Sequence, residues 1–116
     1  MTKSQTYHIF LTIILFTFLL PLYAQKNPSK RADQKYEVGE YYKAIKIYER
    51  VLKRKKKKLD KPKKAEIAYN MAECYNNIND PKKAATEYKK AIKLNYENPA
   101  AVYKFAEMLK MNEQFD

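Results

Sequence analysis

Histidine, cysteine and glycine are almost missing from this sequence of 116 residues. The only histidine is His8, and residues 25–116 hold one cysteine, Cys74, one glycine, Gly39, one serine, Ser29, and one threonine, Thr86. A single cysteine cannot form an internal disulfide, so packing has to stabilise the fold. Without histidine after residue 8, neither a Ser-His catalytic triad nor a histidine-ligated metal site can be assembled there. We therefore expect a protein that is not an enzyme and that holds no cofactor or metal.

The first 24 residues follow the three-part pattern of a secretory signal. Lys3 opens a short polar segment, residues 9–20 are almost wholly apolar, and Ala24 offers a small residue at the cleavage point. The apolar run is shorter than the ~20 residues that cross a bilayer comfortably. We predict export, with cleavage after Ala24, to the periplasm or the periplasmic face of the outer membrane. An uncleaved membrane anchor is the alternative.

The positive charge is concentrated in one segment. The net charge is +11, and residues 53–64 contribute nine basic residues and one acidic residue. These basic residues are Lys53, Arg54, Lys55, Lys56, Lys57, Lys58, Lys61, Lys63 and Lys64. The segment could contact anionic lipid, cell-wall polymer or an acidic protein. The simpler interpretation is a solvated helix end, because cations favour a helix C-terminus. No nucleic-acid recognition motif accompanies the segment, so we expect no nucleic-acid partner.

Prolines mark four helix starts after residue 24. Each follows an Asn or Asp by one or two residues: Asn27-Pro28, Asp60-Lys61-Pro62, Asp80-Pro81 and Asn98-Pro99. Asn and Asp accept hydrogen bonds from free N–H groups of a first turn, and proline tolerates that turn. A fifth start follows Gly39, which suits a left-handed helix end. We expect helices at 28–38, 41–57, 62–78, 81–94 and 99–112, and we find no strand pattern.

Small residues recur in register with a large residue one turn later. The pairs Ala72–Tyr75 and Ala106–Leu109 are related by a sequence interval of 34. The pairs Ala44–Tyr48 and Ala84–Tyr88 are related by an interval of 40. A period of 34 in helix–turn–helix units resembles the tetratricopeptide repeat (TPR). The resemblance implies an all-α fold of antiparallel helix pairs, a TPR-like α-solenoid of about two and a half repeats.

The resemblance divides the chain into four parts. Residues 1–24 are the signal, 25–64 a first repeat with the basic insert, 65–98 a second repeat, and 99–116 the first helix of a truncated third. The chain departs from the repeat at Tyr96, where proline is usual, and at Asn79 and Glu113, where glycine is preferred. We expect the truncation to leave Val102, Phe105, Leu109 and Phe115 uncovered.

Two stretches carry a more specific likeness, "GEYYKAIKIYERVLK" and "AECYNNINDPKKAATEYKKAIKL". With the export signal, they are similar to the N-terminal part of OmpA-family envelope proteins, some of which serve the type IX secretion system. Those proteins place such repeats before a propeller and a peptidoglycan-binding domain. The likeness implies a scaffold that is one segment of a larger envelope protein.

In a tetratricopeptide array the first helix of each pair lines the partner groove. The candidate groove residues are Tyr69, Asn70, Glu73, Asn76, Tyr103, Lys104 and Glu107. Some members grip a C-terminal carboxylate with Asn and basic residues. Only Asn70 and Lys104 match that clamp and Glu73 would repel a carboxylate, so we expect a protein or peptide partner with basic or mixed polar groups.

Other distinctive side chains have simpler explanations. Cys74 lies on the apolar stripe of its helix and is expected to be a small buried hydrophobe rather than a redox or metal residue. Four tyrosines at helical spacing are expected to fill the core rather than bind a ligand: Tyr41, Tyr48, Tyr75 and Tyr88. Two functions remain, an interaction scaffold and a module that docks on an anionic surface through residues 53–64.

Overall fold

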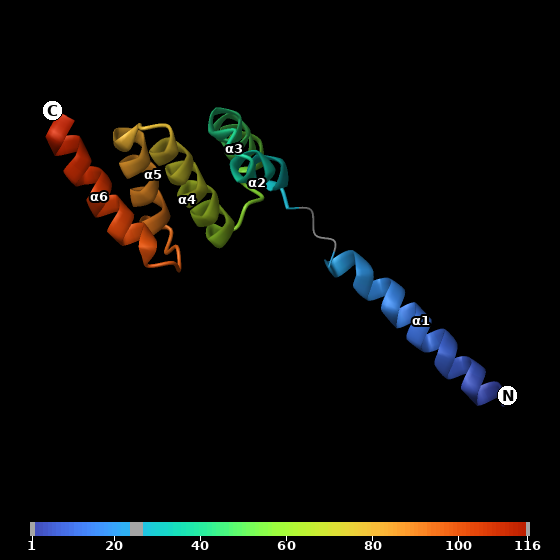
Figure 1. The fold of residues 1–116 in the computed structure, drawn as a ribbon. Helices are drawn as coiled ribbons and strands as arrows, with labels where there is room; N and C mark the ends of the chain where they lie inside the picture. The colour runs from blue at the N-terminus through green and yellow to red at the C-terminus, as the bar shows by residue number, and fades with distance from the viewer. Residues whose placement is uncertain (1, 24–26, 116) are drawn as a thin grey trace.

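The computed structural model describes residues 2–23 and 27–115, with side chains at 2–14 and 27–114. Within these ranges it contains six helices and no strand, which confirms the all-α prediction. The helices are α1 (Lys3–Tyr23), α2 (Lys30–Glu37), α3 (Tyr41–Lys55), α4 (Lys61–Asn77), α5 (Pro81–Lys93) and α6 (Ala100–Phe115) (Figure 1). The helices expected from the sequence after residue 24 all exist, with ends close to the expected positions.

The apolar N-terminal segment forms α1, which lies apart from the other five helices (Figure 1). Its described large apolar side chains are exposed, with Phe10 at 63% and Ile9 at 46%. None of the helices in the described part of the chain has the length and apolar character needed to cross a membrane. The predicted cleavage point at Ala24 lies outside the described residues.

The four predicted Asx–Pro helix starts are confirmed by their hydrogen bonds. Asp60 accepts the backbone N–H of Lys63 at 2.8 Å, and Asp80 accepts that of Lys83 at 3.1 Å. Asn27 and Asn98 play the same part for the N–H groups two residues ahead of them, at 3.1 and 2.9 Å. At α4, α5 and α6 the bond therefore satisfies a donor that the helix leaves free, whereas at α2 Asn27 bonds the residue just before the helix.

A residue with left-handed backbone angles follows each of α2, α4 and α5. Glycine and asparagine adopt this conformation more readily than other residues. Gly39 has φ 77°, and Asn79 and Asn95 have φ 58° and 59°. The last helix, expected to end at residue 112, runs on through Glu113 to Phe115. The Cβ of a glutamate disfavours a left-handed conformation, so continuing the helix costs less.

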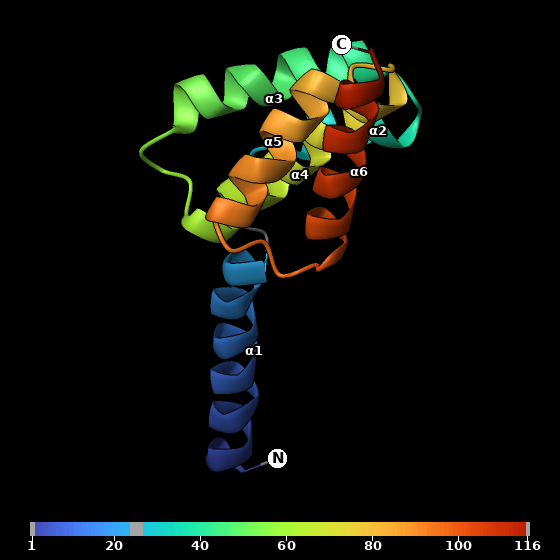
Figure 2. The ribbon, with the colours of Figure 1, turned by 90° about the vertical axis from the view of Figure 1, so that its left-hand side faces the viewer.

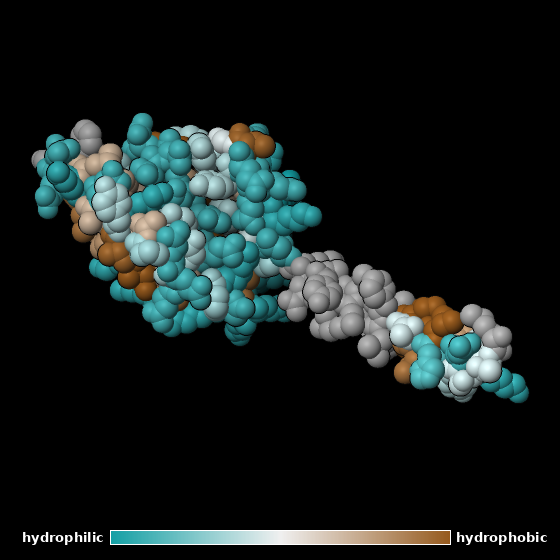
Figure 3. All heavy atoms as spheres, turned by 60° about the horizontal axis from the view of Figure 1, so that its bottom comes forward, coloured by the Kyte–Doolittle hydropathy of each residue, from teal (hydrophilic) through white to brown (hydrophobic). Residues whose placement is uncertain are grey.

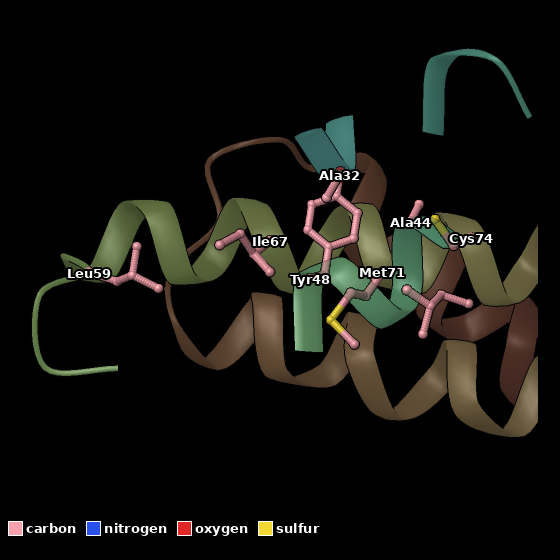
Figure 4. Close-up of a cluster of buried hydrophobic side chains, with 8 residues drawn as sticks. Ala32, Ala44, Tyr48, Leu59, Ile67, Met71 and Cys74 are labelled. Atoms are coloured by element: carbon pink, nitrogen blue, oxygen red, sulfur yellow. The ribbon is translucent and has the colours of Figure 1, made fainter. Parts of the chain in front are cut away.

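The helices pack in chain order, each against the next, from α2 to α6 (Figure 1). One core cluster joins α2, α3 and α4, and its largest buried side chain is Tyr48. The ring of Tyr48 lies between Ala32 and Met71 (Figure 4). Alanine on the facing helix lets the backbones approach and leaves room for the ring.

A second core cluster joins α4, α5 and α6 around Tyr88. Tyr48 and Tyr88 are fully buried, and Tyr41 and Tyr75 pack half-buried against the first cluster. Core filling by these four tyrosines is therefore confirmed. The predicted exposure of one face of α6 is confirmed only in part. Val102 and Leu109 are exposed, but Phe105 packs half-buried against the second cluster. The side chain of Phe115 lies outside the described ones.

Candidate functional site

The candidate groove residues lie on two neighbouring first helices, four on α4 and three on α6. Residues at the repeat interval of 34 occupy matching positions, so Tyr69 corresponds to Tyr103 and Glu73 to Glu107. The structure brings Tyr69, Glu73 and Lys104 into contact with one another. Tyr103 and Glu107 remain exposed, with Tyr103 at 73%. We call the surface that these seven residues form the groove surface.

Glu73 is buried at the centre of this surface, at 9% exposure. Its Oε1 accepts hydrogen bonds from Lys104 Nζ at 2.6 Å and from the hydroxyl of Tyr88. Partial burial alone would lower the pKa of Lys104, but the hydrogen bond and charge of Glu73 outweigh it and raise that pKa. Burial first, and then the bond to Glu73, raise the pKa of Tyr88. The three side chains therefore join α4, α5 and α6 through one charged network.

This network removes the basis for two ideas about the partner. Lys104 is committed to Glu73, so it is not a free cation for a carboxylate clamp. The charge of Glu73 is offset inside the protein, so Glu73 does not by itself favour a basic partner. Asn70 and Asn76 are half-buried neighbours of the Tyr48 and Tyr88 hydroxyls and also face the interior.

Aromatic rings surround the network. The Tyr69 ring stacks on Tyr96 at a centroid distance of 4.5 Å and meets Tyr88 edge-on at 5.7 Å. Lys104 Nζ lies 5.7 Å from the Tyr69 centroid, within the range of a cation–π contact. Tyr96 was not among the candidate residues, although its place where the repeat usually has proline was a usable signal. This part of the surface is aromatic, and its two charges, Glu73 and Lys104, pair with each other.

A shallow pocket of about 560 Å³ continues this aromatic surface toward the start of α4. It lies between the first turn of α4 and the α5–α6 connection. Its lining residues are Lys61, Pro62, Ala65, Glu66, Leu94, Asn95, Tyr96 and Glu97. Tyr96 belongs both to the pocket and to the stack on Tyr69, so the two form one continuous surface.

The basic segment forms the end of α3, a turn, and the start of α4. In Figure 2 the α3–α4 connection lies to one side of the packed helices. The turn is nevertheless anchored, because Leu59 is buried in the first core cluster and its N–H donates to Lys55 O at 3.0 Å. Lys63 bonds both carboxylate oxygens of Glu66 at 3.0 Å. The other eight basic residues form no ion pair with any side chain that the structure describes.

Cys74 is fully buried in the first core cluster, which confirms the expected small hydrophobe. Burial, and then the charge of Glu73, raise the pKa of its thiol to about 12. Because only a thiolate reacts readily, we expect a thiol reagent at pH 8 to label Cys74 no faster than the protein opens. Labelling rates measured across a urea series should therefore follow unfolding, and rapid labelling without denaturant would contradict this burial.

The same acid–tyrosine contact occurs in both helix pairs. Tyr48 donates to Asp33 at 2.7 Å between α3 and α2, and Tyr88 donates to Glu73 between α5 and α4. The sequence interval between the two tyrosines equals the interval between the two acids. The repeated tyrosine is easy to recognise in the sequence because the same residue type recurs. The repeated acid is harder to recognise, because it is Asp in one helix pair and Glu in the other.

Comparison with known proteins agrees with this architecture. Residues 27–97 match the family of the tetratricopeptide repeat. A search among curated proteins found no match. The matched residues cover α2 to α5, the two helix pairs that share the acid–tyrosine contact. This chain therefore belongs to the tetratricopeptide repeat family, whose repeats generally mediate protein–protein interaction and typically act as non-catalytic scaffolds.

Proposed function

We propose that this chain is a non-catalytic scaffold of the cell envelope whose groove surface binds a segment of a partner protein. The observation that carries the proposal is the exposure of Tyr103, 73% accessible, on the same groove surface as the Tyr69 ring that stacks on Tyr96. A large exposed aromatic ring at the repeat position that matches Tyr69 is typical of interface anchors. Because the Tyr103 side chain is exposed, it contributes little to the core of the chain.

The partner chemistry follows from the internal charge pairing. Since Glu73 and Lys104 neutralise each other, a partner gains most from packing apolar or aromatic side chains on the rings of Tyr69, Tyr96 and Tyr103. The adjoining pocket of about 560 Å³ offers space for one such side chain. Glu97 is exposed at its rim and can add a polar contact that orients the partner.

Placement in the envelope rests on the N-terminal segment and on the resemblance to OmpA-family proteins. A polar start, an apolar run and Ala24 form the pattern of an export signal. We propose that the protein lies in the periplasm or at the outer membrane. The more specific proposal is that it serves there in a secretion-system assembly. The mass of the N-terminal peptide of the exported protein, measured by mass spectrometry, tests cleavage after Ala24, which leaves Gln25 as the first residue.

Tyr103→Ala is the sharpest test of the groove surface. The side chain is exposed, so we expect the melting temperature to stay unchanged while recovery of the cross-linked partner from intact envelopes is lost. Tyr42→Ala is the matched control, because Tyr42 is a 68% exposed tyrosine on α3, outside the groove surface. Equal partner recovery with the wild-type chain and Tyr103→Ala would remove the main support for the groove surface.

A second candidate function is docking on an anionic surface through residues 53–64. The specific observation in its favour is that eight of the nine basic side chains lack an ion pair among the described side chains, while Leu59 holds their turn against the core. Because the turn is anchored, its backbone loses little conformational entropy when the segment meets a negative surface. Each lysine near such a surface contributes about 1 kcal/mol.

Vesicle binding distinguishes the two candidates. We expect the combined change of Lys55, Lys56, Lys57 and Lys58 to Gln to weaken binding to phosphatidylglycerol vesicles by at least about tenfold if the segment docks there. The control changes four exposed lysines elsewhere: Lys46, Lys82, Lys89 and Lys93. Binding that is equally weakened in both variants, or insensitive to salt, would show that residues 53–64 are no specific docking surface.

A further inference from the structure

The charges of the five packed helices are divided unequally. The second helices of the two pairs, α3 and α5, carry eleven basic residues and two acidic ones. The helices α2, α4 and α6 together carry eight basic and six acidic residues. Three basic positions on the second helices recur at the repeat interval of 40: Lys43 and Lys83, Arg50 and Lys90, and Lys53 and Lys93. Both second helices are therefore strongly basic.

Most of these cations lack an acidic partner. Acidic side chains pair with three of them, Lys43, Lys83 and Lys90. The other eight form no ion pair with any side chain that the structure describes. An excess of unpaired charge of one sign attracts a partner of the opposite sign. The outer surface of α3 and α5 therefore favours an anionic partner.

A pocket of about 450 Å³ lies between these two basic helices. From α3 it is lined by Tyr42, Ile45, Lys46 and Glu49. The end of α4, the α4–α5 turn and the first turn of α5 form the rest of its wall. None of its lining residues belongs to the groove surface. The pocket is therefore a separate candidate site.

Apolar and aromatic side chains form much of the pocket wall. Ile45 is buried, Tyr75 and Ile78 are half-buried, and the Tyr42 ring is 68% exposed. Figure 3 shows one face of the packed helices, on which hydrophilic side chains predominate and hydrophobic ones form small patches. An exposed ring beside a partly covered apolar wall suits one large apolar side chain of a partner.

Two acids and two lysines also line the pocket. Asp80 pairs with Lys83 at 3.6 Å, and the amino group of Lys83 lies 5.6 Å from the centre of the Tyr75 ring. Glu49 accepts a hydrogen bond from the Tyr75 hydroxyl at 3.5 Å. Lys46 is exposed and forms no ion pair with any described side chain. Among the described side chains, Glu49 is thus the one acid of the pocket without a cationic partner, and the surrounding cations of α3 and α5 outnumber it.

We propose that this pocket binds an acidic segment of a partner protein, anchored by one aromatic side chain of that segment. The anchor packs against the rings of Tyr42 and Tyr75, and acidic residues on either side of it pair with Lys46 and with the other free cations of α3 and α5. A lipid headgroup has no apolar side chain to fill the pocket, so the pocket favours a protein segment over a membrane. The chain then offers two separate binding surfaces, this pocket and the groove surface.

A synthetic peptide tests the proposal. The probe has one phenylalanine between two short runs of glutamate and a fluorescent label at one end. Binding to the full chain is measured by fluorescence anisotropy. Replacing the phenylalanine by alanine is expected to weaken binding at least about tenfold, as for the loss of a buried ring. Added salt should also weaken binding, because the flanking contacts are ionic and exposed.

Two exposed tyrosines distinguish the pocket from the groove surface. Tyr42→Ala is expected to weaken peptide binding at least about tenfold, whereas Tyr103→Ala should bind the peptide as the wild-type chain does. For the partner of the groove surface the expected effects are reversed. Failure of one proposal therefore leaves the other intact.

The sign of the charge preference is tested at Lys46 and Glu49. Lys46→Glu is expected to weaken binding about fivefold, and Lys110→Glu, the same change at an exposed lysine on α6, should have little effect. Glu49→Gln removes the acid that opposes the peptide and should strengthen binding about threefold.

Three results would overturn the proposal. The first is that the peptide does not bind, or binds Tyr42→Ala as well as the wild-type chain. The second is that Glu49→Gln weakens binding, which would mean that the pocket prefers a cation. The third is that phosphatidylglycerol vesicles displace the peptide and that Tyr42→Ala weakens vesicle binding equally. In that case a membrane, and not a protein segment, occupies the site.

Discussion

Replacing Tyr88 by alanine is expected to destabilise the fold more than any other single truncation in the second repeat. The side chain is fully buried in the cluster that joins α4, α5 and α6, and its ring meets Tyr69 edge-on. Truncating a buried aromatic residue costs about 3–5 kcal/mol. Domains of ordinary size have total stabilities of only about 5–15 kcal/mol, so a small repeat array has little in reserve.

A conservative variant separates the ring from the hydroxyl. Tyr88→Phe keeps the ring but takes one donor from the buried Glu73, and should cost about 1–2 kcal/mol. Urea unfolding followed by circular dichroism gives both values. Tyr103→Ala, which removes an exposed tyrosine, should shift the free energy of unfolding by less than about 0.5 kcal/mol. Equal costs for Tyr88→Ala and Tyr88→Phe would mean that the hydroxyl, and not the ring, stabilises the second cluster.

The second large loss of stability is expected from Lys104→Met. This change leaves the carboxylate of Glu73, only 9% exposed, with Tyr88 as its remaining hydrogen-bond partner among the described side chains. Breaking a fully buried ion pair costs about 3–5 kcal/mol, and we expect about 2 kcal/mol because Lys104 retains some solvent contact. The readout is again the free energy of unfolding in urea.

The double variant identifies the cause. Adding Glu73→Gln to Lys104→Met removes the unpaired charge, so it should recover most of the stability that Lys104→Met loses. Lys110→Met, which changes an exposed lysine six residues further along α6, is the control and should change stability little. If the double variant is less stable than Lys104→Met alone, then Glu73 stabilises the fold independently of Lys104.

The fold itself was largely predictable from local sequence. Asp60 and Asp80 before proline, and Gly39 after the second helix, act through hydrogen bonds and backbone angles within a few residues. Such signals do not depend on tertiary contacts, and the helix ends were correspondingly accurate. The alanine–tyrosine spacing added the register of the pairs, because a fixed packing geometry requires the same residue types at the same interval.

The site was less predictable because it depends on contacts between distant parts of the chain. Glu73, Tyr88 and Lys104 come from three different helices, and their side chains meet only after the helices have packed. In the sequence alone, Glu73 and Lys104 are two free charges that would select a partner. Folding pairs them with each other, so neither is free to select a partner. The role of Tyr96 likewise depends on the path of the α5–α6 connection, which places its ring on Tyr69.

The sequence by itself thus determined which segments are helical, where they begin and end, and which residues repeat in register, because short-range hydrogen bonding and periodic packing are encoded locally. Only the tertiary structure decided which charges are internally paired and that the Tyr96 ring stacks on Tyr69. Those properties depend on the distance between side chains far apart in the chain, and no local pattern specifies that distance.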